Sequence, residues 1–327
     1  MENFVKVVLD NGGEIKPLIV PSSMTNGTGL FNPSIFVDGD KIYVNVRHCQ
    51  YTLYHSELNK YEHPYGPLVY LNPEDDITLT TTNYFGELNS DLSVKYLHPV
   101  DTSKLDQKPI WEFVGLEDAR IVKWEDKFYL CGVRRDTTTN GQGRMELSEI
   151  EFDLNGVKEV SRFRIPAPDQ EEQRSYCEKN WVPILDNPYH FVKWSNPCQV
   201  VKVDPDQKSC TSIIVKDKAT FDWDQRGGSQ AVPWKDGYLT LTHQTKLFKS
   251  EAGRKNGIYR HRLNYWDSEW NHIKSSPIFN FMDGMIEFAC GLAIYNENIL
   301  ITFGFQDNAA YVLKTTNEVI EELLNAD

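Results

Sequence analysis

Several features that assign proteins to common functional classes are absent from this sequence. Its cysteines include no CxxC pair, and most of them lie within apolar runs. No apolar run approaches the ~20 residues of a membrane-spanning helix, and the start, Met1 to Lys6, has neither the basic residues nor the apolar core of a secretion signal. We therefore expect reduced, buried cysteines rather than disulfides or zinc ligands, and a soluble cytoplasmic protein without a membrane partner. The cysteines are Cys49, Cys131, Cys177, Cys198, Cys210 and Cys290.

Positive charge is also scarce. The formal net charge of the 327 residues is −13 at pH 7. Such a chain is repelled by the phosphates of nucleic acids and by acidic membranes, so we expect neither as a partner. The local exception is the basic segment from Gly253 to Arg262, which predicts a solvated hairpin rather than a contact with a phosphate backbone.

Helical periodicity is almost absent before the C-terminal end. There, Asn317 to Leu324 predicts one short helix with Thr316 as its N-cap. The rest of the chain alternates short β-branched or aromatic runs with turns of Asp, Asn, Gly and Pro, which is typical of an all-β protein. The 8 Trp, 16 Tyr and 16 Phe suit such a fold and also a carbohydrate site, where Trp111 or Trp181 could stack on a sugar face.

One unit recurs five times along the chain, and it consists of a strand, a tight polar turn and a second strand that ends in a polar residue. The repeats predict a five-bladed β-propeller that forms a single domain over residues 1–327. The copies are about 50 to 85 residues apart, so the blades are irregular and carry long insertions such as Glu57 to Leu97. A large β-sandwich is the alternative. The predicted hairpins begin near residues 33, 119, 181, 229 and 291.

The polar residues that flank these strands follow a pattern. In a propeller the first strand of each blade lines the central channel and is antiparallel to the second, so the start of one and the end of the other meet at one face. We therefore expect a pocket at one end of the channel, with carboxylates from some blades and cationic groups from others. The residues before the first strands are Asn32, Glu117, Asp118, Lys179, Asn180, Arg226 and Glu287, and those that end the second strands are Arg47, Arg134, Lys193, His243 and Asp307.

The run from Gly115 to Arg120 is the most informative of these positions, because it sets two adjacent carboxylates and a guanidinium at the start of an apolar strand. A turn with a local ion pair between Asp118 and Arg120 would explain it without any function. If it is a site, burial and the neighbouring Glu117 should raise the pKa of Asp118, as a general acid requires. Arg120 would either hold Glu117 in place or lower the pKa of Asp118.

At these residues the sequence resembles the mannoside phosphorylases and mannosidases of glycoside hydrolase family 130, which are five-bladed propellers, and related β-propeller mannosyltransferases. Gly115 to Arg120 is similar to the family's Gly-x-Glu-Asp-x-Arg motif, in which the Asp is the general acid and delivers its proton through a sugar hydroxyl. Lys179-Asn180 and Arg226-Gly227-Gly228 resemble phosphate-binding segments of the family. His243 is similar to a phosphate-binding His, and Phe305-Gln306-Asp307 to a closing Ala-Asp.

The sequence also departs from the family pattern. Lysine stands where the phosphorylases usually have the first phosphate-binding arginine, and arginine stands where they have lysine. The second arginine, normally followed by proline, has no clean match, and Lys193-Trp194 is the nearest. Lysine binds phosphate as a point charge and arginine as a fork, so the anion site is expected to keep its charge with a different geometry.

The resemblance implies a role for each candidate. Asp118 is the expected general acid of an inverting glycosyl transfer. The expected sugar-binding residues are Asn32, Arg47, Glu117, Asn180 and Asp307, and the expected phosphate-binding residues are Lys179, Lys193, Arg226 and His243. No metal or other cofactor is expected, since inorganic phosphate or a phosphorylated sugar donor is the substrate, and a homo-oligomer is possible.

Several functions remain open from the sequence. Inorganic phosphate as acceptor or product would make a phosphorylase of a mannose-like sugar, which we favour, and a sugar-nucleotide or sugar-phosphate donor would make a glycosyltransferase. A hydrolase would need a second carboxylate about 6.5 to 9.5 Å from the acid, for which Glu287 and Asp307 are candidates, and would gain nothing from a cationic cluster. A non-catalytic glycan-binding or interaction propeller is the other alternative. Catalysis is favoured if Asp118 shares a pocket with the cations, and binding if Asp118 pairs with Arg120 at the rim.

Overall fold

The structure is a computed structural model that describes residues 2–49, 78–111, 113–136, 141–168, 177–218, 224–249 and 255–326. Residues 57–77 and 169–175 of the predicted long loops (Glu57 to Leu97, Ala167 to Ser175) and residues 253–254 of the basic segment lie outside the described residues. The described chain is all-β, with two short α-helices and one 3₁₀ turn. These are α1 (Phe4–Asp10), α2 (Asn317–Asn325) and η1 (Ser22–Met24).

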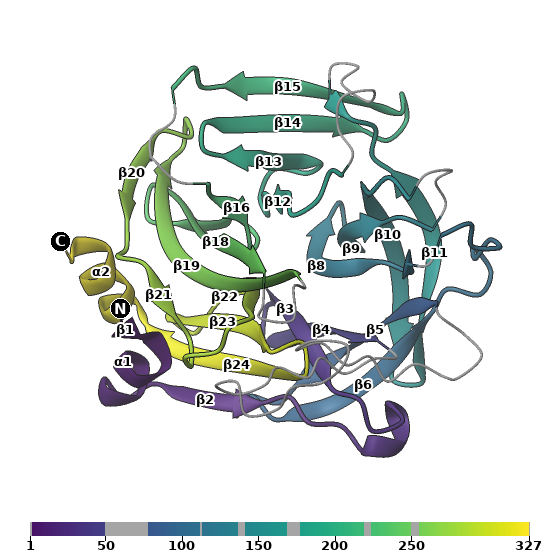
Figure 1. Ribbon diagram of the computed structural model, residues 1–327, viewed down its shortest axis with the longest axis horizontal. Coiled ribbons are helices and arrows are strands. Elements are labelled where there is room, and N and C mark those ends of the chain that lie inside the picture. Colours follow the sequence, from purple (N-terminus) through teal and green to yellow (C-terminus); the bar gives the residue numbers. More distant parts are fainter. Residues whose placement is uncertain are drawn as a thin grey trace.

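Groups of strands stand around a common centre, each with its first strand near the axis and later strands toward the outside (Figure 1). Two antiparallel groups, β3 to β6 and β8 to β11, form one nine-stranded sheet because β6 and β11 pair in parallel, and β7 adds to β5. The bounds are β3 Leu30–Asp38, β4 Lys41–Cys49, β5 Leu79–Leu88, β6 Val94–Asp101, β7 Phe113–Val114, β8 Glu117–Trp124, β9 Lys127–Arg134, β10 Arg144–Asp153 and β11 Gly156–Arg164.

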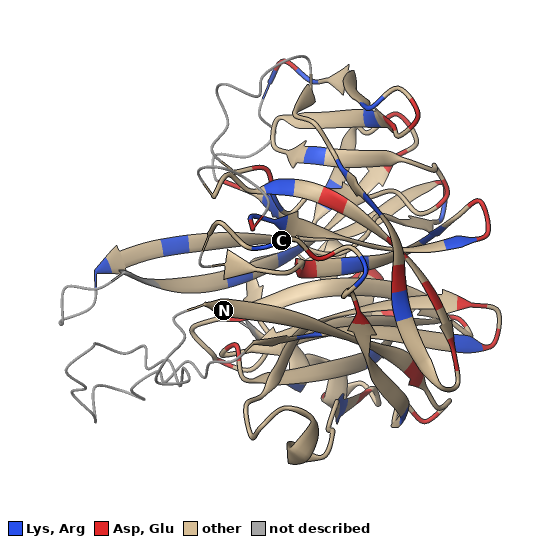
Figure 2. Cartoon of the chain, turned by 90° about the vertical axis from the view of Figure 1, so that its right-hand side faces the viewer, with Lys and Arg blue, Asp and Glu red and all other residues tan. Residues whose placement is uncertain are grey.

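Three further sheets complete the ring. One is the four-stranded β12 to β15, one is a seven-stranded sheet built on β18 and β19, and one is β22 to β24 with β2 added from the early part of the chain. The long β18–β19 hairpin projects beyond the body (Figure 2). The bounds are β1 Glu2–Asn3, β2 Glu14–Pro17, β12 Val182–Pro183, β13 His190–Ser195, β14 Cys198–Asp204, β15 Ser209–Val215, β16 Arg226–Gly227, β17 Val232–Trp234, β18 Gly237–Lys249, β19 Lys255–Asp267, β20 His272–Ser275, β21 Phe279–Asn280, β22 Glu287–Tyr295, β23 Asn298–Phe305 and β24 Ala309–Thr316.

The predicted hairpins are confirmed. They are β3–β4, β8–β9, β12–β13, β17–β18 and β22–β23, each an antiparallel pair. Two of their turns have positive φ at both central residues, 51° and 63° at Glu125 and Asp126 and 46° and 64° at Asn296 and Glu297, as the turn that matches strand twist requires. Because the sheets surround one centre instead of facing each other in two layers, the sandwich alternative is wrong.

Of the two α-helices, α2 was predicted from the sequence and α1 was not. The C-terminal helix is confirmed as α2, and the side chain of Thr316 accepts a hydrogen bond from the Val319 amide as its cap. Helix α1 was not expected, since Phe4–Asp10 is rich in β-branched residues that favour strands. Its formation rests on the Asn3 cap, whose side chain accepts from the Lys6 amide at 3.0 Å, and on the burial of three residues of one face: Phe4, Val5 and Val8.

Near the axis, one buried side chain, that of Gln230, bonds to three strands of two different sheets. The Gln230 amide nitrogen donates to the carbonyl oxygens of Ile35 in β3 and Ile121 in β8, both at 2.9 Å. Its amide oxygen accepts from the backbone N–H of Leu292 in β22 at 3.2 Å. Backbone groups at the inner edge of a sheet have no next strand to pair with, so Gln230 satisfies groups that would otherwise be buried unpaired.

Candidate active site

One cavity of about 220 Å³ lies where the strand ends converge, and all ten predicted site residues except Lys193 line it. They come from β3, β4, β8, the segment before β12, β16, β18 and the turn after β23, so every group of strands around the axis contributes. Starts of first strands and ends of second strands thus meet at one face, as the topology predicts. The nine are Asn32, Arg47, Glu117, Asp118, Lys179, Asn180, Arg226, His243 and Asp307.

Four of these residues have a left-handed backbone, which is rare outside glycine. The φ angles are 47° at Asn32, 50° at Asp118, 61° at Asn180 and 49° at Asp307. In β3 and β8 the residue lies where the strand register shifts, that is, in a β-bulge. A bulge redirects the side chain, and Asn and Asp tolerate the left-handed region better than other residues with a side chain. The left-handed backbone at these four positions therefore directs polar side chains into the cavity from several sheets.

The carboxylates gather on one side of the cavity around Arg47. Its guanidinium donates to Asp118 at 2.9 Å and lies 3.5 Å from Glu117. Asn32 donates a second hydrogen bond to the same oxygen of Asp118 at 2.8 Å. Arg135 approaches the other oxygen of Glu117 at 3.8 Å. Asp118 therefore accepts hydrogen bonds from residues of β3 and β4, and its side chain remains 19% exposed.

Arg120 forms no ion pair with Asp118 or Glu117, whereas the alternative that its charge lowers the pKa of Asp118 agrees with the electrostatics of the site. Arg120 is buried, and its guanidinium donates to the backbone carbonyl oxygens of Gly228 at 2.8 Å and Asp118 at 2.7 Å. It also lies over the Phe288 ring, 5.5 Å from the centroid. The bulge turns the Asp118 side chain away from Arg120, so Arg47 takes the place that sequence proximity suggested for Arg120. A local ion pair at the rim is thereby ruled out.

The two aspartates of the cavity differ in protonation. Burial alone would raise the pKa of Asp118, but the Arg47 charge, the Asn32 hydrogen bond and Arg120 outweigh it, so the pKa lies below its ordinary value of 3.8. This reverses the sequence expectation. Burial, together with the negative charges of Asp118 and Glu117, raises the pKa of Asp307 to about 7, although Arg47 opposes this. Asp307 makes no hydrogen bond or ion pair within the described residues.

The cavity is also lined by two basic residues, Lys179 and Arg226. Lys179 is exposed and has no ion pair within the described part of the chain. Arg226 donates to Asp224 at 2.8 Å and keeps 38% of its side chain exposed. An anion placed here would meet one cation without a carboxylate partner and one that keeps donor groups besides its Nε.

His243 lies behind these cations as a neutral ring. It is 3% exposed, stacked on Tyr259 with ring centroids 5.7 Å apart, and its Nδ1 has no partner among the described residues. Burial, followed by the charges of nearby basic groups, holds the pKa of His243 well below its ordinary value of 6.5. A neutral imidazole can donate one hydrogen bond to an anion but adds no charge.

Lys193 lies apart from the other predicted site residues. It forms a buried ion pair with Glu178 at 3.4 Å, and Glu178 also accepts from the Trp181 indole at 3.1 Å. Trp181 is therefore buried and is not available for stacking. The three residues line an adjoining cavity of about 270 Å³, which shares Lys179, Asn180 and Arg226 with the first.

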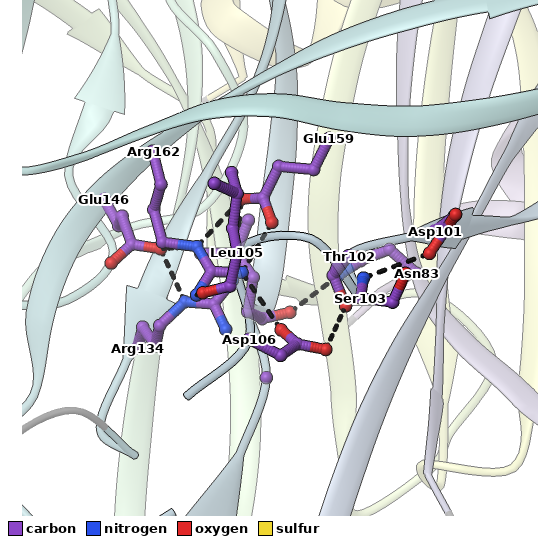
Figure 3. Close-up of polar contacts among 12 residues, drawn as sticks. Asn83, Asp101, Thr102, Ser103, Leu105, Asp106, Arg134, Glu146, Glu159 and Arg162 are labelled. Carbon is purple, nitrogen blue, oxygen red and sulfur yellow. Dashed lines mark hydrogen bonds and ion pairs between the residues drawn. The ribbon is translucent and has the colours of Figure 1, made fainter. Parts of the chain in front are cut away.

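Two further candidates are also excluded from the cavity. Glu287 is fully buried and accepts hydrogen bonds from the backbone N–H groups of Phe281, Met282 and Gly284, so it cannot activate a water molecule. Arg134 points into an ion cluster between β9, β10 and β11 (Figure 3). The members of that cluster are Asp106, Arg134, Glu146, Glu159 and Arg162.

Six lining residues were not anticipated. The hairpin register places Tyr259 opposite Thr245, two residues beyond His243, so the β18–β19 pairing could have revealed both. The others come from loops and strand ends with no sequence signal. The six are Leu79, Phe113, Thr245, Tyr259, Ile286 and Phe288. Their rings and alkyl groups give the cavity an apolar part of its wall.

Within the described residues, no group of three or more His, Cys, Asp or Glu is arranged to hold a metal ion. No helix in the same residues is long and apolar enough to cross a membrane.

An all-β ring of sheets with a polar cavity at one end of its axis defines a propeller-like protein. The solved structures that this chain is similar to include mannoside phosphorylases of glycoside hydrolase family 130. The β-1,2-mannobiose phosphorylase from Listeria innocua, in complex with β-1,2-mannobiose, has a TM-score of 0.55 at 12% identity over 94% of this chain and 93% of that chain.

Two other neighbours give the same picture. A structure from work on family 130 hydrolases that target β-1,2-mannosidic linkages in Candida mannan has a TM-score of 0.59 at 15% identity, over 89% of this chain and 85% of that chain. A mannose phosphorylase from Leishmania mexicana, in complex with phosphate ion, has a TM-score of 0.52 at 11% identity, over 96% and 92%. No protein-family model and no curated protein matches the sequence. At these identities the likeness establishes the fold.

Proposed function

We propose that this protein is a carbohydrate-active enzyme of the glycoside phosphorylase type, built on a five-bladed β-propeller, that transfers a mannose-like sugar to or from phosphate with inversion. The observation that carries the proposal is a single cavity lined by Asp118, by the cations Lys179 and Arg226 and by His243. An inverting transfer requires a proton-transferring group and a phosphate site that act on opposite faces of the sugar ring, and the cavity supplies residues for both roles.

The low pKa of Asp118 favours one direction of the reaction at neutral pH. In that direction an acceptor hydroxyl oxygen forms a bond to the anomeric carbon of a sugar 1-phosphate, and its proton passes to the Asp118 carboxylate. The bond from the anomeric carbon to the phosphate oxygen breaks with its electron pair, and the leaving phosphate is held by Lys179, Arg226 and a hydrogen bond from His243. Phosphorolysis is the reverse, and it starts from protonated Asp118.

The remaining polar residues would orient the sugar. Asn32 and Asn180 supply amide groups, and Asp307 supplies a carboxyl that retains its proton near neutral pH. Arg47 and Glu117 complete the polar wall on the acidic side.

Of the two candidate bases for hydrolysis, Glu287 is buried against backbone amides, and Asp307 lines the cavity with a pKa of about 7. Phosphate transfer is favoured over hydrolysis because Lys179 and Arg226 have no role in activating water. The reaction needs no metal or organic cofactor.

The proposal is tested with purified protein, mannose 1-phosphate and a panel of manno- and gluco-configured acceptors. Release of inorganic phosphate that depends on an acceptor and falls by at least 10³-fold in Asp118→Asn is the expected result. Asp126→Asn, in an exposed turn, is the matched control and should leave the rate unchanged. If phosphate release is equally fast in Asp118→Asn, Asp118 is not the proton-transferring group.

A sugar-nucleotide donor is the second candidate, and the adjoining cavity of about 270 Å³ favours it. This cavity continues beyond the shared Lys179 and Arg226, and Trp194 at its side is 45% exposed. Inorganic phosphate alone would leave it unfilled, whereas a nucleoside diphosphate could extend into it and stack its base on the indole. Turnover with GDP-mannose that falls in Trp194→Ala, while turnover with mannose 1-phosphate does not, would select this candidate; equal effects would reject it.

A further inference from the structure

An aromatic and guanidinium surface adjoins the acidic side of the cavity. Phe113 lines the cavity beside Glu117 and is 37% exposed. The Arg135 guanidinium lies over the Phe113 ring, 5.9 Å from its centroid, and its Nε is 3.8 Å from the Glu117 carboxylate. Carboxylate, guanidinium and aromatic ring thus follow one another outward from the site.

The same surface continues to Trp111. Arg135 donates to the carbonyl oxygen of Gly141 at 3.5 Å, and a Cβ atom on Gly141 would lie 2.4 Å from the Trp111 indole. The indole therefore rests directly on this glycine, whose φ of 66° places it in the left-handed region. Trp111 is 36% exposed, and the backbone N–H of Ile110 bonds to the Asp136 carbonyl at 3.3 Å, which fixes the segment.

This surface has no evident role in stabilising the fold. A single exposed apolar residue needs no explanation, but here two aromatic rings and the 55% exposed Ile110 gather within four positions of the sequence, next to a cavity. Aromatic faces bind the C–H faces of sugars, and a guanidinium donates to several hydroxyl groups at once. The combination suits a neutral polyhydroxylated ligand better than a lipid or an anion.

We propose that Phe113, Arg135 and Trp111 bind the acceptor, a saccharide of at least two sugar rings. This rests on the proposed function, because the acceptor hydroxyl must reach Asp118, and the surface begins beside Glu117 on the Asp118 side of the cavity. Phe113 receives the ring that carries the attacking hydroxyl, and Trp111 receives the next ring outward. The donor phosphate binds at Lys179 and Arg226 of the same cavity.

Acceptor kinetics test the proposal. With mannose 1-phosphate as donor, Phe113→Leu should raise the KM for mannose and mannobiose by about 5- to 10-fold. Trp111→Ala should raise the KM for mannobiose and mannotriose by a similar factor and leave that for mannose unchanged. Leu154→Ala, at an exposed position in the turn between β10 and β11, is the control. Unchanged KM values for mannobiose in both variants would overturn the proposal, and so would equal effects of Trp111→Ala on mannose and mannotriose.

A binding measurement separates this proposal from the proposed function. Isothermal titration of Asp118→Asn with mannotriose and cellotriose reports on the surface whether or not the wild type turns over mannose 1-phosphate. Binding of either trisaccharide that is weakened about 5-fold or more by adding Trp111→Ala or Phe113→Leu supports the acceptor surface. Absence of binding, or binding unaffected by both substitutions, refutes it even if the enzyme proves to be a phosphorylase. Replacement of Phe113 by leucine keeps apolar packing, so a loss of binding is not a loss of folding.

Discussion

Arg47 is the one guanidinium that reaches Asp118, and it must also serve Glu117. Asp307 in the same cavity has no partner among the described residues, and burial raises its pKa to about 7, whereas Arg47 helps to hold the pKa of Asp118 below 3.8. Burial and unequal access to one arginine therefore separate the two aspartates. Proximity along the chain had suggested Arg120 for this role, and only the direction of the bulged backbone shows otherwise.

The raised pKa of Asp307 predicts a pH-dependent cost in stability. From about pH 4 to pH 7 the folded state holds a proton that the unfolded chain has released, so wild-type stability falls as pH rises through this window. Asp307→Asn cannot ionise, and we expect it to be more stable than wild type at pH 8 by on the order of 2 kcal/mol, with little difference at pH 4.5. Urea denaturation at both pH values measures this.

The control for that experiment is Asp126→Asn, in an exposed turn. Its stability relative to wild type should change by less than about 0.5 kcal/mol between the two pH values. A stability difference for Asp307→Asn that is the same at pH 4.5 and pH 8 would mean that Asp307 ionises normally.

At the scale of elements, the hairpins could be predicted from the sequence, but the directions of the side chains at their strand ends could not. Each hairpin is encoded locally by two apolar runs and a turn, so β3–β4, β8–β9 and β22–β23 follow from the sequence. Side-chain direction at a strand end depends on whether a bulge precedes it and on residues from other sheets. Lys193 and Glu287 were wrongly expected at the cavity for this reason, since each is held by a buried partner that no sequence spacing indicates.

Close packing of β23 against β3 gives a second prediction. A Cβ atom on Gly304 would lie 2.2 Å from the Asn32 side-chain oxygen and 2.5 Å from its backbone nitrogen. Gly304→Ala should therefore displace Asn32 from Asp118, lower kcat/KM for transfer at least 10-fold and destabilise the fold by about 2 kcal/mol. Thermal denaturation and initial rates measure the two effects. Gly156→Ala, where a Cβ meets nothing within 4 Å, should alter neither. Wild-type stability in Gly304→Ala would show that β23 can move away.

At the scale of the whole molecule, the axis is held by a polar side chain rather than by apolar packing alone. Gln230→Leu keeps the volume but leaves two carbonyl oxygens and one N–H without partners. We expect a loss of about 4 kcal/mol in the free energy of unfolding, measured in urea. Gln207→Ala, in an exposed turn, is the control. A loss below about 1 kcal/mol in Gln230→Leu would mean that water replaces the amide.

Acidic and basic residues both occur in the turns along the right-hand edge of Figure 2, and basic residues mark the β18–β19 hairpin on the other side. His243, Thr245 and Tyr259 of that hairpin line the cavity. The net charge of −13 predicts repulsion of polyanions, and the basic residues of this hairpin weaken that repulsion for a small anion that approaches beside it.

Strand β2 pairs with β24, so a segment near the start of the chain completes the sheet that the last strands form. The cavity draws residues from Asn32 to Asp307, all of which precede β24, so a nascent chain holds every residue of the site before β24 can pair with β2 and complete the sheet. We expect sugar or phosphate binding to report whether β2 has paired with β24. Any condition that separates β2 from β24 should abolish binding at the same point at which the protein unfolds. A saturating ligand should in turn stabilise the pairing of β2 with β24.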